Sequence, residues 1–186
     1  MRWVPFVILA YLIVLFQTTA GRLLMIRTSS IGTIGPDLAA LAAVFVALYA
    51  RNWADVMLVA WSLGLAVDLT TAAGPGGLTV VGPMPIAYAL TAGLLFRVRE
   101  AFFRERALTQ ALLAWAFCLV AHGAWVTAQS LLARGQTTWS AYWRWLGQAV
   151  GLAFYTGALM PLAHFGLRKC RRWLLTGPVG PGRRGR

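Results

Sequence analysis

The chain has 186 residues, of which 59% are hydrophobic and only 12% are charged. Soluble domains contain roughly 25% charged residues, so this composition excludes an ordinary soluble domain and indicates an integral membrane protein. The formal net charge of +12 could suggest a nucleic-acid partner. However, the basic residues lie between and after the apolar segments instead of on one face. This pattern favours cytoplasmic membrane loops over nucleic-acid binding.

Six apolar segments approach the length of about 17–25 residues that a helix needs to cross a membrane. In chain order they cover about residues 3–20, 34–50, 54–69, 78–96, 107–132 and 145–165. We therefore predict an all-α, polytopic membrane bundle of about six transmembrane helices over residues 1–172. Five spans are the alternative, if the third and fourth segments pack as one broken unit. The basic Gly- and Pro-rich tail, residues 173–186, is expected to be disordered.

The distribution of Lys and Arg predicts the orientation of these helices. With the N-terminus inside, 13 of the 17 basic residues lie on the inner side and 4 on the outer side. The positive-inside rule therefore predicts that both termini are cytoplasmic. The first segment loosely resembles a signal peptide, but an uncleaved helix fits better, because cleavage would reverse this charge balance.

The chain offers few groups for catalysis. It contains two histidines, His122 and His164, and two cysteines, Cys118 and Cys170, which lie at different depths and predict no disulfide. No spacing is typical of a metal site, a nucleophile motif or a phosphate-binding loop. We therefore expect no enzyme activity, no cofactor and no metal. His122 is expected to form a hydrogen bond within the bundle.

Two acidic residues lie at the ends of apolar segments. Asp37 follows Pro36 at the start of the second segment, where an acid complements the helix dipole. Asp68 lies at the C-terminal end of the third segment, where an acid opposes the dipole and needs a partner. Both acids are expected near the outer side, at the level of Arg22 and Arg27. We predict that these four charged residues form a structural polar cluster between the first three helices.

Two further features predict surfaces for partners. Gly147 and Gly151 allow a close helix approach, either within the bundle or to another protein. Trp139, Trp143 and Trp145 gather at the predicted outer boundary, and we expect them to form a partner interface together with the two glycines. Four basic residues at the inner end of the sixth segment are expected to contact anionic lipid headgroups: Arg168, Lys169, Arg171 and Arg172.

Several short motifs follow one another in a defined order over roughly residues 10–97. They are Gln17-Thr18-Thr19, Pro36-Asp37-Leu38, Gly64-Leu65-Ala66-Val67-Asp68-Leu69, a Gly/Pro turn and Gly77-Leu78. In order and spacing they resemble the rod shape-determining membrane proteins of the MreD family. The resemblance implies a non-enzymatic, multi-pass component of the bacterial inner membrane that serves the cell-elongation machinery.

The resemblance also implies partners. Members of that family associate with the periplasmic scaffold protein MreC, in a complex that links cytoplasmic MreB filaments to the wall-synthesising glycosyltransferase and transpeptidase. The alternative is the substrate-binding subunit of an energy-coupling-factor vitamin transporter, whose architecture is similar. In that case Asp37, Asp68, Arg22 and the outer tryptophans would line a pocket for a small polar ligand.

Overall fold

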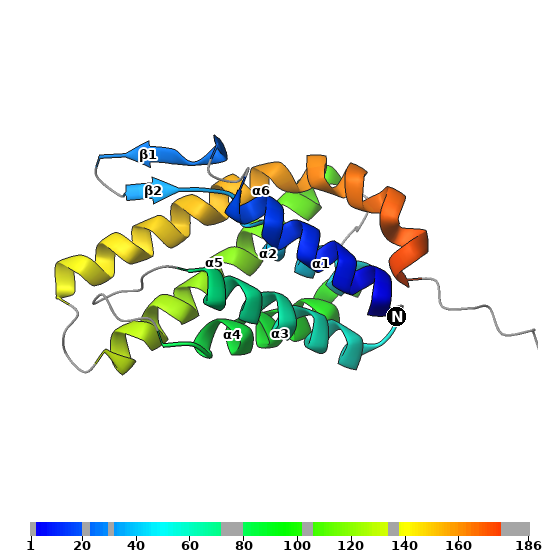
Figure 1. Ribbon diagram of the computed structural model, residues 1–186, viewed down its shortest axis with the longest axis horizontal. Coiled ribbons are helices and arrows are strands. Elements are labelled where there is room, and N and C mark those ends of the chain that lie inside the picture. Colours follow the sequence, from blue (N-terminus) through cyan, green and yellow to red (C-terminus); the bar gives the residue numbers. More distant parts are fainter. Residues whose placement is uncertain are drawn as a thin grey trace, which may run out of the picture.

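A computed structural model describes residues 3–19, 23–29, 32–71, 80–101, 106–133 and 138–175. Six α-helices make up most of it, as the sequence predicts (Figure 1). Their bounds are α1 Trp3–Thr18, α2 Leu38–Tyr49, α3 Trp53–Thr70, α4 Pro83–Val98, α5 Ala107–Leu132 and α6 Trp139–Leu175. A 3₁₀ turn, η3 (Arg99–Ala101), follows α4.

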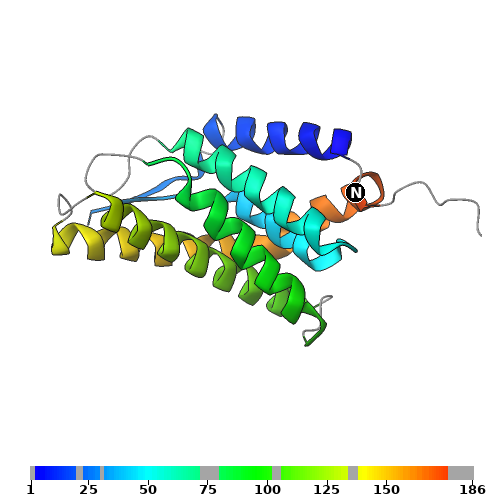
Figure 2. The same ribbon diagram turned by 90° about the horizontal axis from the view of Figure 1, so that it is seen from below.

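The helices run back and forth between two ends of an elongated bundle (Figures 1 and 2). One end carries the connection between α1 and α2, and we call it the hairpin end. The start of α1 and the end of α6 both lie at the other end, which we call the opposite end. This arrangement fits an even number of passes between the two ends.

Three helices are long and apolar enough to cross a membrane: α3, α5 and residues Trp139–Lys169 of α6. The other three, α1, α2 and α4, are also apolar but have only 12–16 residues. The chain is therefore a helical bundle with the composition and helix lengths of a membrane protein. The count of six helices is confirmed, and the number of spans stays a prediction.

A β-hairpin between α1 and α2 was not predicted. Strand β1 (Ile26–Thr28) pairs in antiparallel fashion with β2 (Gly32–Ile34), and Arg27 lies opposite Thr33. The second predicted segment therefore starts too early, since Ile34 belongs to the strand. Pro36 disfavours a helical conformation in the residue before it, so α2 begins only after Asp37.

The sixth helix differs from its prediction at both ends. It starts at Trp139 instead of Trp145 and continues through Pro161 to Leu175. The basic segment after Phe165 is therefore part of the helix, and residues 173–175 are helical instead of belonging to the tail. Residues 176–186, which were predicted to be disordered, lie outside the described residues.

Helix α2 forms the centre of the bundle. Residues 39–48 are all buried, and the helix contacts the five other α-helices. A helix that is apolar on every side either spans a membrane or is buried among other elements, and here other helices surround it. Because α2 is central, the groups that form hydrogen bonds with its two ends also connect it to other helices. These groups define the candidate site.

Candidate functional site

Asp37 holds the N-terminal end of the central helix. It is the N-cap of α2, and its Oδ1 accepts a hydrogen bond from the backbone N–H of Ala40 at 2.9 Å. The preceding proline and the short acidic side chain are typical of such a helix start. However, the side chain is only 1% exposed, whereas most N-caps lie at the surface. A carboxylate buried to this degree requires further donors.

Two side chains from other helices supply those donors. Tyr88 on α4 donates its hydroxyl to Asp37 Oδ2, and His122 Nε2 on α5 lies 2.8 Å from the same oxygen. On α6, the Thr156 hydroxyl accepts the Asp37 backbone N–H at 3.0 Å. One acidic residue therefore joins α2, α4, α5 and α6. The predicted hydrogen bond of His122 within the bundle is confirmed.

Asp68 satisfies the start of a helix other than its own. It lies in the last turn of α3, is 2% exposed, and accepts the backbone N–H groups of Gly82 and Met84 at 2.8 and 3.3 Å. Those groups open α4, whose N-cap Gly82 has a φ of +130° and no side chain to do this. The indole N–H of Trp125 on α5 completes the set, 2.9 Å from Oδ1.

The predicted partners of the two acids are therefore wrong where the structure describes them. Arg27 is exposed on β1, and neither Asp37 nor Asp68 bonds to it. Arg22 lies outside the described residues. The prediction placed the acids at a membrane boundary beside arginines. Instead, both turn into the bundle, where side-chain donors of other helices and the N–H groups at helix N-termini stabilise the carboxylates without a Lys or Arg among their hydrogen-bond partners.

The glycine in the same motif as Asp68 also has a structural role. Gly64 is buried on α3, and a Cβ atom added to it would lie 2.8 Å from both the Met84 carbonyl oxygen and Pro85 Cα on α4. Because those atoms belong to the backbone, they cannot move aside easily. Gly64 therefore sets the close approach of α3 to α4, one turn before Asp68 caps α4.

Arg99 forms hydrogen bonds with the C-terminal end of the central helix, a role that was not predicted from the sequence. Arg99 is 8% exposed, and its Nη1 donates to the carbonyl oxygens of Ala47 and Ala50 at 3.0 and 2.5 Å. Its guanidinium also lies 3.8 Å from the centre of the Phe96 ring. A cation at this position complements the helix dipole and satisfies carbonyl groups that end a helix. In the sequence, Arg99 counted only as an inner-side charge.

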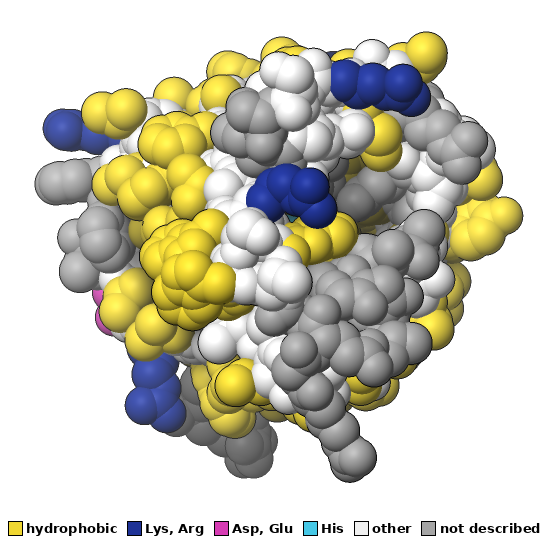
Figure 3. Space-filling view, turned by 90° about the vertical axis from the view of Figure 1, so that its left-hand side faces the viewer, with side chains coloured by type: hydrophobic (Ala, Val, Ile, Leu, Met, Phe, Trp, Pro, Cys, Tyr) yellow, Lys and Arg dark blue, Asp and Glu magenta, His cyan; other side chains and the backbone are white. Residues whose placement is uncertain are grey.

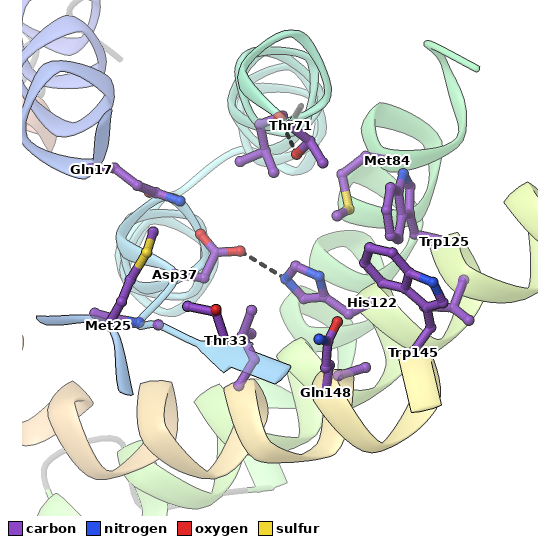
Figure 4. Close-up of a pocket in the computed structure, with 16 residues that line it drawn as sticks. Gln17, Met25, Thr33, Asp37, Thr71, Met84, His122, Trp125, Trp145 and Gln148 are labelled. Carbon is purple, nitrogen blue, oxygen red and sulfur yellow. Dashed lines mark hydrogen bonds and ion pairs between the residues drawn. The ribbon is translucent and has the colours of Figure 1, made fainter. Parts of the chain in front are cut away.

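A cavity of about 240 Å³ lies beside the Asp37–His122 pair, towards the hairpin end (Figure 4). Polar atoms come from Gln17, Thr33, Thr71 and Gln148, in addition to the pair itself. Two tryptophans, Trp125 and Trp145, form one wall, and their ring centres are 6.3 Å apart at an interplanar angle of 69°. Figure 3 looks onto the hairpin end, where a recess lies among apolar and basic side chains.

The predicted interface residues separate into two groups. Gly151 faces Ile34 of β2, since an added Cβ would lie 2.6 Å from its Cδ1, so the close approach expected of a partner is made by the chain's own hairpin. Gly147 and Trp145 are half-buried, and Trp145 packs on Trp125. Only two of the five residues are exposed: Trp139 at 73% and Trp143 at 53%.

The predicted lipid contacts lie at the opposite end. Arg168 and Lys169 are exposed on α6, and the side chains of Arg171 and Arg172 lie outside the description. Within the described ranges, no group of three or more His, Cys, Asp or Glu side chains could hold a metal ion. Comparison of the chain with protein-family models, with curated proteins and with solved structures found no match.

Proposed function

We propose that this chain is a non-enzymatic inner-membrane component of the bacterial cell-elongation machinery, of the MreD type. In this role it binds an MreC-like periplasmic scaffold and helps to link MreB filaments to the peptidoglycan glycosyltransferase and transpeptidase. One observation carries the proposal: Asp37, Gly64 and Asp68, which belong to two of the motifs behind the MreD resemblance, form framework contacts of the bundle.

The two motifs around Asp37 and Asp68 hold different junctions, and Gly77-Leu78 lies outside the described residues. Pro36 and Asp37 start the central helix and join it to α4, α5 and α6. Gly64 sets the spacing between α3 and α4, and Asp68 caps α4 and bonds to α5. These residues are spread over the N-terminal half of the chain, and yet they serve one set of junctions. This pattern is expected for residues that a shared fold requires. This supports the resemblance more strongly than any single short motif does.

The rest of the molecule suits a scaffold. Its described part consists of six helices with a small hairpin, and much of the surface is apolar. Helix α1 exposes large side chains along its length, among them Val4 at 72%, Val7 at 60% and Tyr11 at 66%. At the hairpin end, Trp139 and Trp143 form an exposed aromatic cluster with Tyr142. Such rigid aromatic side chains are common anchors in protein interfaces.

Depletion of the protein in its own bacterial host tests this function. We expect cells to lose normal elongation or shape when the chain is depleted, and a plasmid copy of the parent sequence to restore it. Depletion that leaves cell dimensions and the rate of wall synthesis unchanged would contradict the proposed function.

A second function is favoured by one observation, the cavity beside Asp37 and His122. A substrate-binding subunit of an energy-coupling-factor vitamin transporter would use a pocket at this end of a similar bundle. In that case the chain would co-purify with an ATPase module instead of an MreC-like protein, and its deletion would impair uptake of one vitamin.

A further inference from the structure

The cavity beside Asp37 has the dimensions of a site for a small organic molecule. Its volume of about 240 Å³ is somewhat below the usual range of ligand pockets, about 300–1,000 Å³, so only a small molecule would fit. Side chains from α1, α3, α4, α5, α6 and β2 converge on it, together with the segment before α2. A ligand there would contact nearly every element of the bundle.

The hydrogen bonds of Asp37 determine which nitrogen of His122 is available. A carboxylate only accepts hydrogen bonds, so the ring nitrogen that faces Asp37, Nε2, carries the proton. In the neutral ring Nδ1 is then an acceptor. Among the described residues Nδ1 has no hydrogen-bond partner, and Figure 4 shows it on the side of the ring away from Asp37. A neutral His122 therefore presents an unused acceptor at the cavity.

The charges around the cavity favour a cation. Asp37 carries a negative charge, and the described lining residues include no Lys or Arg. The faces of Trp125 and Trp145 add the negative potential of their ring systems, which attracts a cation placed over them. Among the described lining residues, an anion such as a carboxylate or phosphate would meet no Lys or Arg side chain. The amides of Gln17 and Gln148 can serve a ligand of either polarity.

We propose that this cavity binds a small, flat organic cation, such as an amidinium or a protonated heteroaromatic amine. Its N–H group donates to Nδ1 of His122, and its ring lies against Trp125 or Trp145. The assignment goes beyond the scaffold function and does not depend on it. If the second function held, it would name the chemical class of the transported substrate.

Three molecules of nearly equal shape test the charge preference: benzamidine, benzamide and benzoate. Isothermal titration calorimetry on the full chain in detergent measures their binding. We expect saturable binding of benzamidine, at least tenfold weaker binding of benzamide, and no binding of benzoate. Binding of benzoate as tight as that of benzamidine would overturn the charge assignment. Absence of binding for all three would overturn the proposal.

Two neighbouring substitutions on α6 locate the site. Ala149 is 5% exposed and lines the cavity, so Ala149→Leu fills it and should abolish benzamidine binding. Val150 is 36% exposed, so Val150→Leu adds similar bulk outside the cavity and should leave binding unchanged. Melting curves of the two variants serve as the control that both fold. Unchanged binding by folded Ala149→Leu would place the benzamidine site elsewhere. Binding is measured on the purified chain, whereas the proposed function is tested by depletion in cells. A failure to bind benzamidine would therefore not change the expected result of the depletion experiment.

Discussion

Asp68 shows how a single acidic side chain can be unfavourable for its own helix and favourable for the next. At the end of α3 it opposes the dipole of that helix. The same carboxylate lies at the start of α4, where Pro83 has no N–H and Gly82 has no side chain. The chain therefore uses one residue to end a helix and to cap the helix that follows.

Substitution Asp68→Asn tests this cap. The amide NH₂ would face one of the N–H groups that the carboxylate now accepts, either from Trp125 or from the start of α4. We expect a loss of about 1–3 kcal/mol of stability and a melting temperature in detergent that falls by several degrees. Ser62→Ala, on the same helix, removes only a bond to the helix's own backbone and should change little. Equal melting of Asp68→Asn and the parent would contradict the capping role.

Substitution Tyr88→Phe tests the second buried acid. It removes the hydroxyl that donates to Asp37 and keeps the ring, which packs against Phe117. We expect a loss of about 1–3 kcal/mol, because the buried carboxylate loses a donor. Tyr11→Phe is the matched control, since Tyr11 is 66% exposed. If thermal melting cannot distinguish the two variants, the Tyr88 hydroxyl does not stabilise Asp37.

At the scale of helices, the contact between α3 and α4 depends on one glycine. Gly64→Ala would push a methyl group against the backbone of Met84 and Pro85. We expect it to cost about 1–3 kcal/mol through overpacking. Gly123→Ala on α5 meets nothing within 4 Å and should be neutral or slightly stabilising, because alanine favours a helix. Comparison of the two melting temperatures checks this, and a Gly64→Ala variant as stable as Gly123→Ala would show that the helices can separate without cost.

The six helices could be predicted from hydropathy, because long apolar runs with few charges have one stable arrangement in a membrane. The hairpin could not, since two three-residue strands leave no periodic signal and depend on packing against α6. The need of Asp68 for a partner was predictable from the helix dipole. Its actual partners were not, because Trp125 lies 57 residues away in the chain.

The sequence left two alternatives open for Gly151 for a related reason. A small residue predicts that something approaches the helix closely, but not whether that is another protein or the chain itself. Here Ile34 occupies the position, 117 residues earlier in the sequence. Likewise, the charge of Arg99 fitted the positive-inside rule, and nothing in its sequence context indicated that it clamps α2.

For the whole molecule, the topology is the first property to test. The start of α1 and the end of α6 lie together at the end of the bundle that is away from the hairpin. In the predicted orientation, 13 of the 17 basic residues belong to that side. Reporter fusions after Arg186 and within residues 97–106 should therefore report a cytoplasmic location. Fusions within residues 74–77 and 134–138 should report a periplasmic one. A periplasmic C-terminus would contradict the six-span orientation.

Co-purification from the membranes of its host tests the proposal that the chain is an MreD-type scaffold. We expect the tagged chain to retain an MreC-like protein, identified by mass spectrometry. Joint replacement of the exposed Trp139 and Trp143 by alanine should weaken this association. Replacement of Trp61, which is 46% exposed on α3, should not. Purification of the parent chain with a transporter ATPase module and without any MreC-like protein would contradict the scaffold function.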